Sequence, residues 1–256
     1  KLDTGMSRLG YVVLDDKLDE IADEIKQISQ FEGIILEGMY THFATADARN
    51  KEFENLQTHR FSEMVDKVKD MGVNIEYIHC SNSAEILDCD EKYDMVRPGI
   101  IQYGIYPSNE VSYSIDIKPV MTFKAKVSNV KVLDAGTSIS YGRVYFTTVR
   151  EKIISIAAGY ADGFLRGRRN PYVYINGVKC SIVGRICMDQ CMVRVPIDMD
   201  VKVNDDVVIF GDDLVSVDDV ARGCDTIAHE VMCMMSRRVP RVYYRHGEIV
   251  SIVDYL

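Results

Sequence analysis

The feature that most constrains the fold is a change of sequence pattern near Pro107. Before it, residues 16–30 and 51–71 place apolar side chains at helical spacing, so each stretch predicts an amphipathic helix. Short apolar runs at 31–43 and 75–79 alternate with these helices and end in polar residues. Alternating helices and strands predict parallel strands whose carboxyl-terminal ends carry the functional loops.

This alternation continues to about residue 108. Ser83 begins a further predicted helix, and residues 95–106 predict a strand that is broken at Pro98-Gly99. A complete (β/α)8 barrel needs about 250 residues, and this region contains less than half of that. We therefore predict the C-terminal part of a TIM (β/α)8 barrel.

A β-rich pattern follows. Glycine turns such as Asn176-Gly177 separate its apolar runs and favour tight hairpins. Ser216, with Asp219 three residues later, predicts a capping box at the start of one helix that ends near Met235. The chain closes with a predicted hairpin around His246-Gly247. The predicted strands before that helix are 121–133, 152–157, 172–183, 192–196 and 207–210.

The fold class predicted from the two halves is α/β plus β. We place the division between a partial barrel domain at residues 1–112 and a mostly antiparallel β-domain at 113–256. Lys1 is not a methionine and lies inside what we take to be an ordered element, so we expect further sequence upstream of it.

Composition excludes several classes of protein. A formal charge of −9 and a pI near 5.1 argue against a nucleic-acid partner, because such proteins collect Lys and Arg on one face. The 7 cysteines form no CxxC pair, and their odd number leaves at least one free, which favours a reducing, cytoplasmic compartment. Cys187 and Cys191 have no histidine at ligand spacing, so no metal site is predicted. The sequence contains no run of about 18 apolar residues, so no membrane segment is predicted.

Tyr141 is the first candidate for chemistry. Ser140 precedes it and Gly142 follows it, just after a turn signal, so its phenol is expected at the end of a strand. Taken alone, the same pattern is typical of a half-buried packing tyrosine with a hydrated hydroxyl.

A set of motifs distributed in order along the whole chain adds to this candidate. They are KLDTGMSRLG at 1–10, THFATAD at 41–47, HCSNSA at 79–84, MVRPGI at 95–100, ISYG at 139–142, GYADGF at 159–164, GRICMDQ at 184–190 and RVPR at 238–241. Together they resemble the alanine racemases, which are pyridoxal-phosphate enzymes. The resemblance implies a TIM-type barrel followed by a β-domain, pyridoxal 5'-phosphate as cofactor, and a homodimer. In that dimer each active site combines the barrel of one subunit with the β-domain of the other.

The resemblance also implies residue roles. Tyr141 matches one of the two proton-transferring bases, His42 its hydrogen-bond partner, and Arg97 the partner of the cofactor's ring nitrogen. An arginine only donates hydrogen bonds, so that nitrogen would stay unprotonated and the ring would withdraw electrons less strongly. His79 would orient Arg97 from behind.

Further positions match residues that hold the phosphate and the substrate. Ser83, the amides of Gly99 and Ile100, and Arg237 are the expected phosphate ligands, although Ser83 also fits a plain helix N-cap. The expected substrate contacts are Lys1, Arg8, Met188 and Asp189, where Lys1 matches a lysine that is carbamylated in many members and Met188 equally fits core packing. The expected entrance residues are Asp47, Tyr160, Arg166 and Arg185.

Two departures from the family pattern bear on function. Arg237 replaces a phosphate-binding tyrosine, which opens the alternative of a polar substrate such as serine, as in racemases of the vancomycin-resistance type. The family's cofactor-bound lysine lies in a Lys-Ala-Asn/Asp-Ala-Tyr-Gly motif that does not occur in these residues.

We therefore predict racemisation of a small amino acid, most simply L-alanine to D-alanine for the cell wall. The alternatives are a serine racemase, a basic-amino-acid decarboxylase of similar architecture, and a non-catalytic fragment that dimerises or contacts the cofactor.

Overall fold

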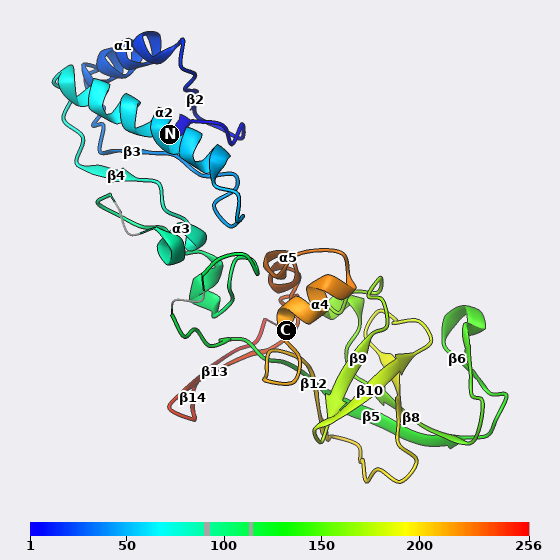
Figure 1. The fold of residues 1–256 in the computed structure, drawn as a ribbon. Helices are drawn as coiled ribbons and strands as arrows, with labels where there is room; N and C mark the ends of the chain where they lie inside the picture. Colours follow the sequence, from blue (N-terminus) through cyan, green and yellow to red (C-terminus); the bar gives the residue numbers. More distant parts are fainter. Residues whose placement is uncertain (90–92, 113–114, 256) are drawn as a thin grey trace. The chain divides into compact units, whose positions relative to one another are not determined.

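A computed structural model describes residues 1–89, 93–112 and 115–255 of the 256-residue chain. These residues form two compact units, Lys1–Lys118 and Pro119–Leu256 (Figure 1). The predicted domain boundary falls between residues 112 and 113, and residue 113 lies outside the described part of the chain, as does residue 256.

The first unit is built from parallel strand pairs and helices, as the alternating pattern predicts. Strand β1 pairs with β2, and β3 pairs with β4 so that Tyr40 lies opposite His79. The elements are β1 (Leu2–Asp3), β2 (Tyr11–Val12), α1 (Leu18–Ser29), β3 (Gly38–Tyr40), α2 (Glu52–Asp70), β4 (Tyr77–His79), α3 (Ser83–Asp88) and the 3₁₀ helix η1 (Ile100–Tyr103).

The core of this unit lies between the helices and the β3/β4 pair. Helix α2 buries Phe61, Met64 and Val68, and α1 contributes Ile21 and Ile25 to the same cluster. In Figure 1 the two helices lie side by side over the strands. The apolar stripes predicted from the sequence therefore face the core. The carboxyl-terminal ends of the strands carry polar side chains.

Two predictions for this unit are corrected. The strand predicted over 31–43 shrinks to β3, and Ile35, which lies before it, is 90% exposed. Residues 95–106 form no strand. Pro98 has no amide hydrogen to pair in a ladder, and Gly99 turns the chain into η1. An apolar run without regular alternation does not by itself specify a strand.

The second unit is organised around a closed barrel of antiparallel strands in the order β10-β11-β8-β5-β12-β9. Its strands are β5 (Phe123–Leu133), β8 (Glu151–Ile156), β9 (Tyr172–Ile175), β10 (Val178–Val183), β11 (Cys191–Val195) and β12 (Asp206–Phe210). Closure leaves the barrel without sheet edges. The predicted antiparallel β-domain is confirmed.

Shorter pieces project from the barrel. Strands β6 (Ser138–Ile139) and β7 (Tyr145–Phe146) pair with each other around the 3₁₀ helix η2 (Tyr141–Arg143). A second 3₁₀ helix, η3 (Tyr160–Asp162), follows β8. The predicted C-terminal hairpin is confirmed as β13 (Arg241–Arg245) and β14 (Glu248–Val253).

Local turn chemistry accounts for the hairpins. Asn176 and Gly177 have φ values of 50° and 76°, and His246 and Gly247 have 52° and 83°. Two consecutive residues with positive φ form the turn whose twist matches the flanking strands, and asparagine and glycine tolerate it best. The tight turn predicted at Asn176-Gly177 is therefore confirmed, and positive φ at both residues is its physical cause.

The helix predicted from Ser216 to Met235 is two helices, α4 (Val217–Gly223) and α5 (Ala228–Cys233). Its beginning is confirmed, because the Ser216 hydroxyl accepts from the Asp219 amide at 3.1 Å and the Asp219 carboxylate accepts from the Ser216 amide at 3.1 Å. Gly223 ends α4, and Asp225 adopts a left-handed φ of 57°. The apolar spacing continues across this break, which is why the pattern suggested one helix.

Candidate functional site

Arg97 lies across the carboxyl-terminal ends of β3 and β4. Its Nη2 donates to the carbonyl of Thr41 at 2.8 Å and to that of Cys80 at 2.9 Å, each directly after one of the strands. Its Nη1 contacts Nδ1 of His79. One guanidinium therefore ties the two strand ends together, where a parallel arrangement places its functional groups.

The same guanidinium influences the tautomer and the protonation state of two histidines. Nδ1 of His42 lies 3.3 Å from Nη2 of Arg97. Because arginine has no acceptor, a lone pair of Nδ1 facing it is favoured in both His42 and His79, which places the hydrogen of each neutral ring on Nε2. The contact with His42 is the weaker one, since the two hydrogens of Nη2 have nearer acceptors in the carbonyls of Thr41 and Cys80. Burial lowers the pKa of His42, and the charges of Arg97, Arg8 and Lys1 lower it further. Burial and Arg97 likewise lower the pKa of His79. His42 is thus a neutral N–H donor.

Tyr40 completes the packing of this cluster. Its ring stacks on His79 with centroids 4.9 Å apart, and the Arg97 guanidinium lies 5.4 Å from its centroid. Tyr40 is not among the residues predicted for the site. The available signal was its place two residues before His42 on the same predicted strand.

Positive charge gathers around these groups. Burial lowers the pKa of Lys1, as do Arg8 and Arg97, while Asp3 raises it. The Asp3 carboxylate is already engaged by the amides of Gly5 at 3.1 Å and Ser7 at 2.9 Å, which shapes the turn that leads to Arg8. Several cations held close together favour binding of an anion, because the anion offsets their mutual repulsion.

Ser83 lies beside backbone amides at the turn that leads into η1. Its hydroxyl oxygen accepts from the amides of Gly99 at 2.9 Å and Ile101 at 3.4 Å. The alternative that Ser83 is the N-cap of α3 is wrong, because Asn82 caps the helix by accepting from the amides of Ala84 and Glu85. A buried hydroxyl beside backbone amides at a turn fits a phosphate group. Ile101, which the sequence analysis missed, supplies an amide next to the predicted Ile100.

In the second unit Tyr141 stands on η2 and is 70% exposed. Ser140, with φ of 65°, anchors the preceding turn by donating its hydroxyl to the carbonyl of Arg185 at 2.7 Å. A Cβ at Gly142 would lie 3.3 Å from the guanidinium of Arg185. The phenol is therefore presented to the surface from a turn packed closely on Arg185, and the alternative of a half-buried packing tyrosine is wrong.

Two further predicted residues lie on the same loop system. Tyr160 donates its amide to the carbonyl of Cys187 at 3.1 Å, and Ala161 donates to that of Met188 at 2.8 Å. The backbones are so close that a Cβ at Gly159 would lie 2.4 Å from both carbonyl oxygens. Met188 is 57% exposed, so the alternative that it is plain core packing is wrong. Asp189 is also exposed.

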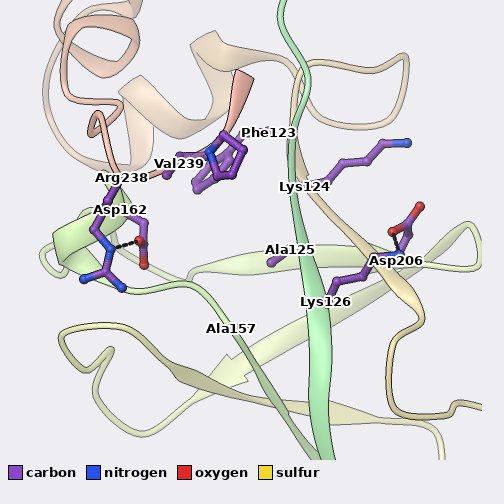
Figure 2. A pocket seen from close by; sticks show the side chains of 10 residues that line it. Phe123, Lys124, Ala125, Lys126, Ala157, Asp162, Asp206, Arg238 and Val239 are labelled. Atoms are coloured by element: carbon purple, nitrogen blue, oxygen red, sulfur yellow. Dashed lines mark ion pairs between the residues drawn. The ribbon is translucent and has the colours of Figure 1, made fainter. Parts of the chain in front are cut away.

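The residues on either side of Arg237, Ser236 and Arg238, contact Asp162 at the end of η3. Figure 2 shows Arg238 beside Asp162, with Nε 2.9 Å from Oδ1. Asp162 also accepts from the Gly159 amide at 2.8 Å, and its carbonyl accepts from the Ser236 amide at 3.3 Å. The pair borders a cavity of about 350 Å³ with apolar walls at Phe123, Val239 and Pro240. Arg237 itself is exposed, with its guanidinium 5.9 Å from the ring centroid of Tyr255.

The predicted site residues thus fall into two groups. Residues of the first unit, apart from Asp47, lie around Arg97 and Ser83, whereas Tyr141, Tyr160, Arg185 and Met188 share connected turns of the second unit. Asp47 is exposed, and its carbonyl accepts from the Ser108 hydroxyl at 2.6 Å. Arg166 is exposed on the loop after η3.

An α/β unit with a cluster of cations, followed by a closed antiparallel barrel, defines a class of two-domain proteins. Residues 1–107 match the family described as "Alanine racemase, N-terminal domain", and residues 120–243 match "Alanine racemase, C-terminal domain". Alanine racemase 2 of Caldanaerobacter subterraneus subsp. tengcongensis is 45% identical over 100% of this chain and 66% of its own length. Alanine racemase of Clostridium novyi is 42% identical over 100% of this chain and 67% of its own length.

Solved structures agree. Alanine racemase of Clostridium difficile 630 has a TM-score of 0.94 at 45% identity, over 99% of this chain and 66% of that one. Alanine racemase of Bacillus anthracis with bound L-Ala-P has a TM-score of 0.91 at 34% identity, over 99% and 66%. The chain belongs to the alanine racemase family, with that family's N-terminal barrel domain and C-terminal β-domain. Both domains are represented, so the comparisons do not support the prediction that only a C-terminal part of the fold is present.

The chain spans 66% of the length of the first of these relatives. None of the helices in the described ranges has the length and apolar character that a membrane span requires.

Proposed function

We propose that the protein containing these residues is a pyridoxal-phosphate-dependent alanine racemase that interconverts L-alanine and D-alanine for cell-wall synthesis. The observation that carries the proposal is the position of His42, whose Nδ1 lies 3.3 Å from Nη2 of Arg97 and whose pKa is lowered by burial and then by that charge, which favours a neutral ring that donates from Nε2. Such a donor suits an oxyanion, and Tyr141 supplies an exposed phenol. The similarity to proteins named alanine racemase supports the same conclusion.

The groups of the first unit fit the cofactor. Ser83 and the amides of Gly99 and Ile100 would hold its phosphate, the Gly99 amide by exchanging the Ser83 oxygen for a phosphate oxygen. Arg237 of the second unit would be a further cation. Arg97, held by His79, would contact the ring nitrogen. When bound, pyridoxal phosphate withdraws electrons from the amino acid's Cα and makes its proton acidic. Because Arg97 only donates, it keeps this withdrawal weak, which favours return of the proton to Cα over side reactions.

Racemisation requires a proton to leave one face of Cα and another to arrive on the opposite face. Tyr141 would serve one face. A phenol ordinarily ionises near pH 10, so its anion needs a donor, and Nε2–H of His42 is the one we assign. The other base is the family's cofactor-bound lysine, which no lysine of these residues matches.

Substrate contacts follow from charge and position. Arg8 and Lys1 would attract the carboxylate, with the Met188 amide and Asp189 beside it. Asp47, Tyr160, Arg166 and Arg185 would narrow the entrance. Arg237, in place of the family's tyrosine, supports a second candidate substrate, serine, because a guanidinium at the pocket wall can hydrogen-bond a hydroxyl.

We further propose a cytoplasmic homodimer whose active sites take residues 1–112 from one subunit and 113–256 from the other.

The test uses the full-length protein with L-alanine, L-serine and isotopically labelled carboxyl groups. We expect alanine to racemise without loss of the carboxyl carbon. Release of labelled carbon dioxide would indicate the decarboxylase alternative, and an inert protein would indicate the non-catalytic one. Relative rates with alanine and serine decide the substrate.

Tyr141→Phe tests the one-face role. Because racemisation has an equilibrium constant of one, its rates fall equally in both directions. We therefore measure exchange of the Cα proton with solvent. Exchange from L-alanine should slow by about 10²–10⁴-fold, while exchange from D-alanine and the cofactor's absorbance persist. Tyr160→Phe is the control. Equal loss of exchange from both enantiomers, with release of cofactor, would exclude this role.

A further inference from the structure

Gln57 is a polar exception on the buried face of α2. Its side chain is 0% exposed, although the same face of the helix buries Phe61, Met64 and Val68. Its Oε1 accepts from the Ala44 amide at 2.9 Å, and its Nε2 donates to the His42 carbonyl at 3.1 Å. One carboxamide therefore binds the backbone on both sides of Phe43, in the segment that carries His42.

The second hydrogen of Nε2 begins a chain of hydroxyls. Nε2 donates to Thr4 Oγ1 at 3.2 Å, Thr4 Oγ1 lies 2.8 Å from Thr41 Oγ1, and Thr41 Oγ1 donates to the Leu2 carbonyl at 2.9 Å. Since the Thr41 hydroxyl hydrogen is used on Leu2, Thr4 must be the donor between the two threonines. All donors thus point one way, from α2 to β1, and both threonines are 0% exposed. A fully paired buried network admits one arrangement of its members.

This network ends where the proposed chemistry begins. The Thr41 carbonyl also accepts from Nη2 of Arg97 at 2.8 Å. Nδ1 of the next residue, His42, lies 3.3 Å from the same Nη2. Arg97 therefore contacts the side chain of His42, while Gln57 binds its backbone carbonyl. A displacement of the His42 carbonyl would lengthen the imidazole contact with Arg97.

We infer that Gln57 is a positioning residue that fixes His42 against Arg97 and thereby supports proton transfer at Tyr141. The inference rests on the proposed role of His42. An apolar side chain would fill the same space but remove the partner of the part-buried Ala44 amide and His42 carbonyl, so the 42–44 segment would move toward other partners or water.

The main test compares Gln57→Leu with Val68→Ala in the full-length holoenzyme. Both remove interactions from the buried face of α2, but Val68 contributes only to the apolar core. We measure the thermal midpoint, kcat and KM for alanine, and the titration of His42 by NMR with labelled histidine, assigned with a His42→Gln variant. Release of the segment should reduce the burial and the cationic field at His42.

We expect Gln57→Leu to move the pKa of His42 up toward the ordinary 6.5 and to lower kcat at least tenfold with little change in KM. Val68→Ala should leave the titration unchanged at a similar loss of thermal midpoint. Equal titration and equal kcat in the two variants would overturn the inference, because Gln57 would then be a packing residue only.

Thr4 provides a second pair in case Gln57→Leu does not fold. Thr4→Ser keeps the hydroxyl chain, whereas Thr4→Val keeps the shape and breaks it. The titration of His42 should shift in Thr4→Val and return in Thr4→Ser, and identical titrations would overturn the inference. Because the titration is read without turnover, a wild-type protein that fails to racemise alanine removes the proposed function and leaves the positioning measurement intact.

Discussion

At the scale of single residues, the first unit holds a buried pair of carboxyl groups, Glu54 on α2 and Glu85 on α3. Glu85 is 4% exposed. Burial, followed by a hydrogen bond and charge repulsion from Glu54, raises the pKa of Glu85 to about 8, and Lys51 opposes the rise. Lys51 is engaged with Glu54 at 2.8 Å and lies 4.0 Å from Asp88. The pair therefore shares a proton at neutral pH.

This proton predicts a pH dependence of stability. Between the ordinary 4.5 and about 8, native Glu85 keeps a proton that the unfolded chain releases. The free energy of unfolding should therefore fall as pH rises through this range, and Glu85→Gln should remove that slope. Thermal midpoints of the full-length protein from pH 5 to 9 test this, with the exposed Glu52→Gln as control. A slope that persists in Glu85→Gln would assign it to other groups.

The sequence predicts site residues that lie in short motifs, but it does not predict those that reach the site only through tertiary contacts. His42, His79 and Arg97 occur in short motifs, and the structure brings them together. Gln57 lies in the middle of a helix with no local signal, because its partners are 13, 15 and 53 residues away. The role of Asn82 as the N-cap was missed for a smaller reason, since either Asn82 or its neighbour Ser83 satisfies the capping preference.

At the scale of elements, periodicity identified helices better than strands. The helices α1 and α2 match their predictions closely because a long apolar stripe is informative. The strand predicted over 31–43 was overextended, since only Gly38–Tyr40 finds a pairing partner in β4. Strand bounds depend on neighbours that the local sequence does not contain.

An ion pair joins two elements of the second unit. Asp162 ends η3 and holds Arg238, which leads into β13. Asp162→Ala would leave the Gly159 amide and the Arg238 guanidinium without this acceptor, at a cost of about 2 kcal/mol. We expect the thermal midpoint of the full-length protein to fall by several degrees, whereas the exposed Asp198→Ala leaves it unchanged.

A double-mutant cycle separates the pair from the amide contact. If the pair contributes, Asp162→Ala should cost less in an Arg238→Ala background than in the wild type. Equal costs in both backgrounds would show that the Gly159 contact alone accounts for the loss.

At the scale of the whole molecule, the C-terminal hairpin is unusual because its apolar side chains are exposed. Val242, Tyr244, Ile249, Val250 and Ile252 all lie open to solvent on β13 and β14. A two-stranded hairpin is marginally stable alone, and clustered exposed apolar groups are typical of contact surfaces. In the proposed homodimer, the second copy is the covering surface we expect.

Val250→Lys combined with Ile252→Lys tests that expectation, because two charges cannot be buried in an apolar contact without a partner. Sedimentation of the full-length protein should shift from dimer toward monomer, with racemisation lost in parallel if the active site takes groups from both subunits. Ile35→Lys, at a 90% exposed position of the first unit, is the control. An intact, active dimer would show that this hairpin is not part of the dimer contact.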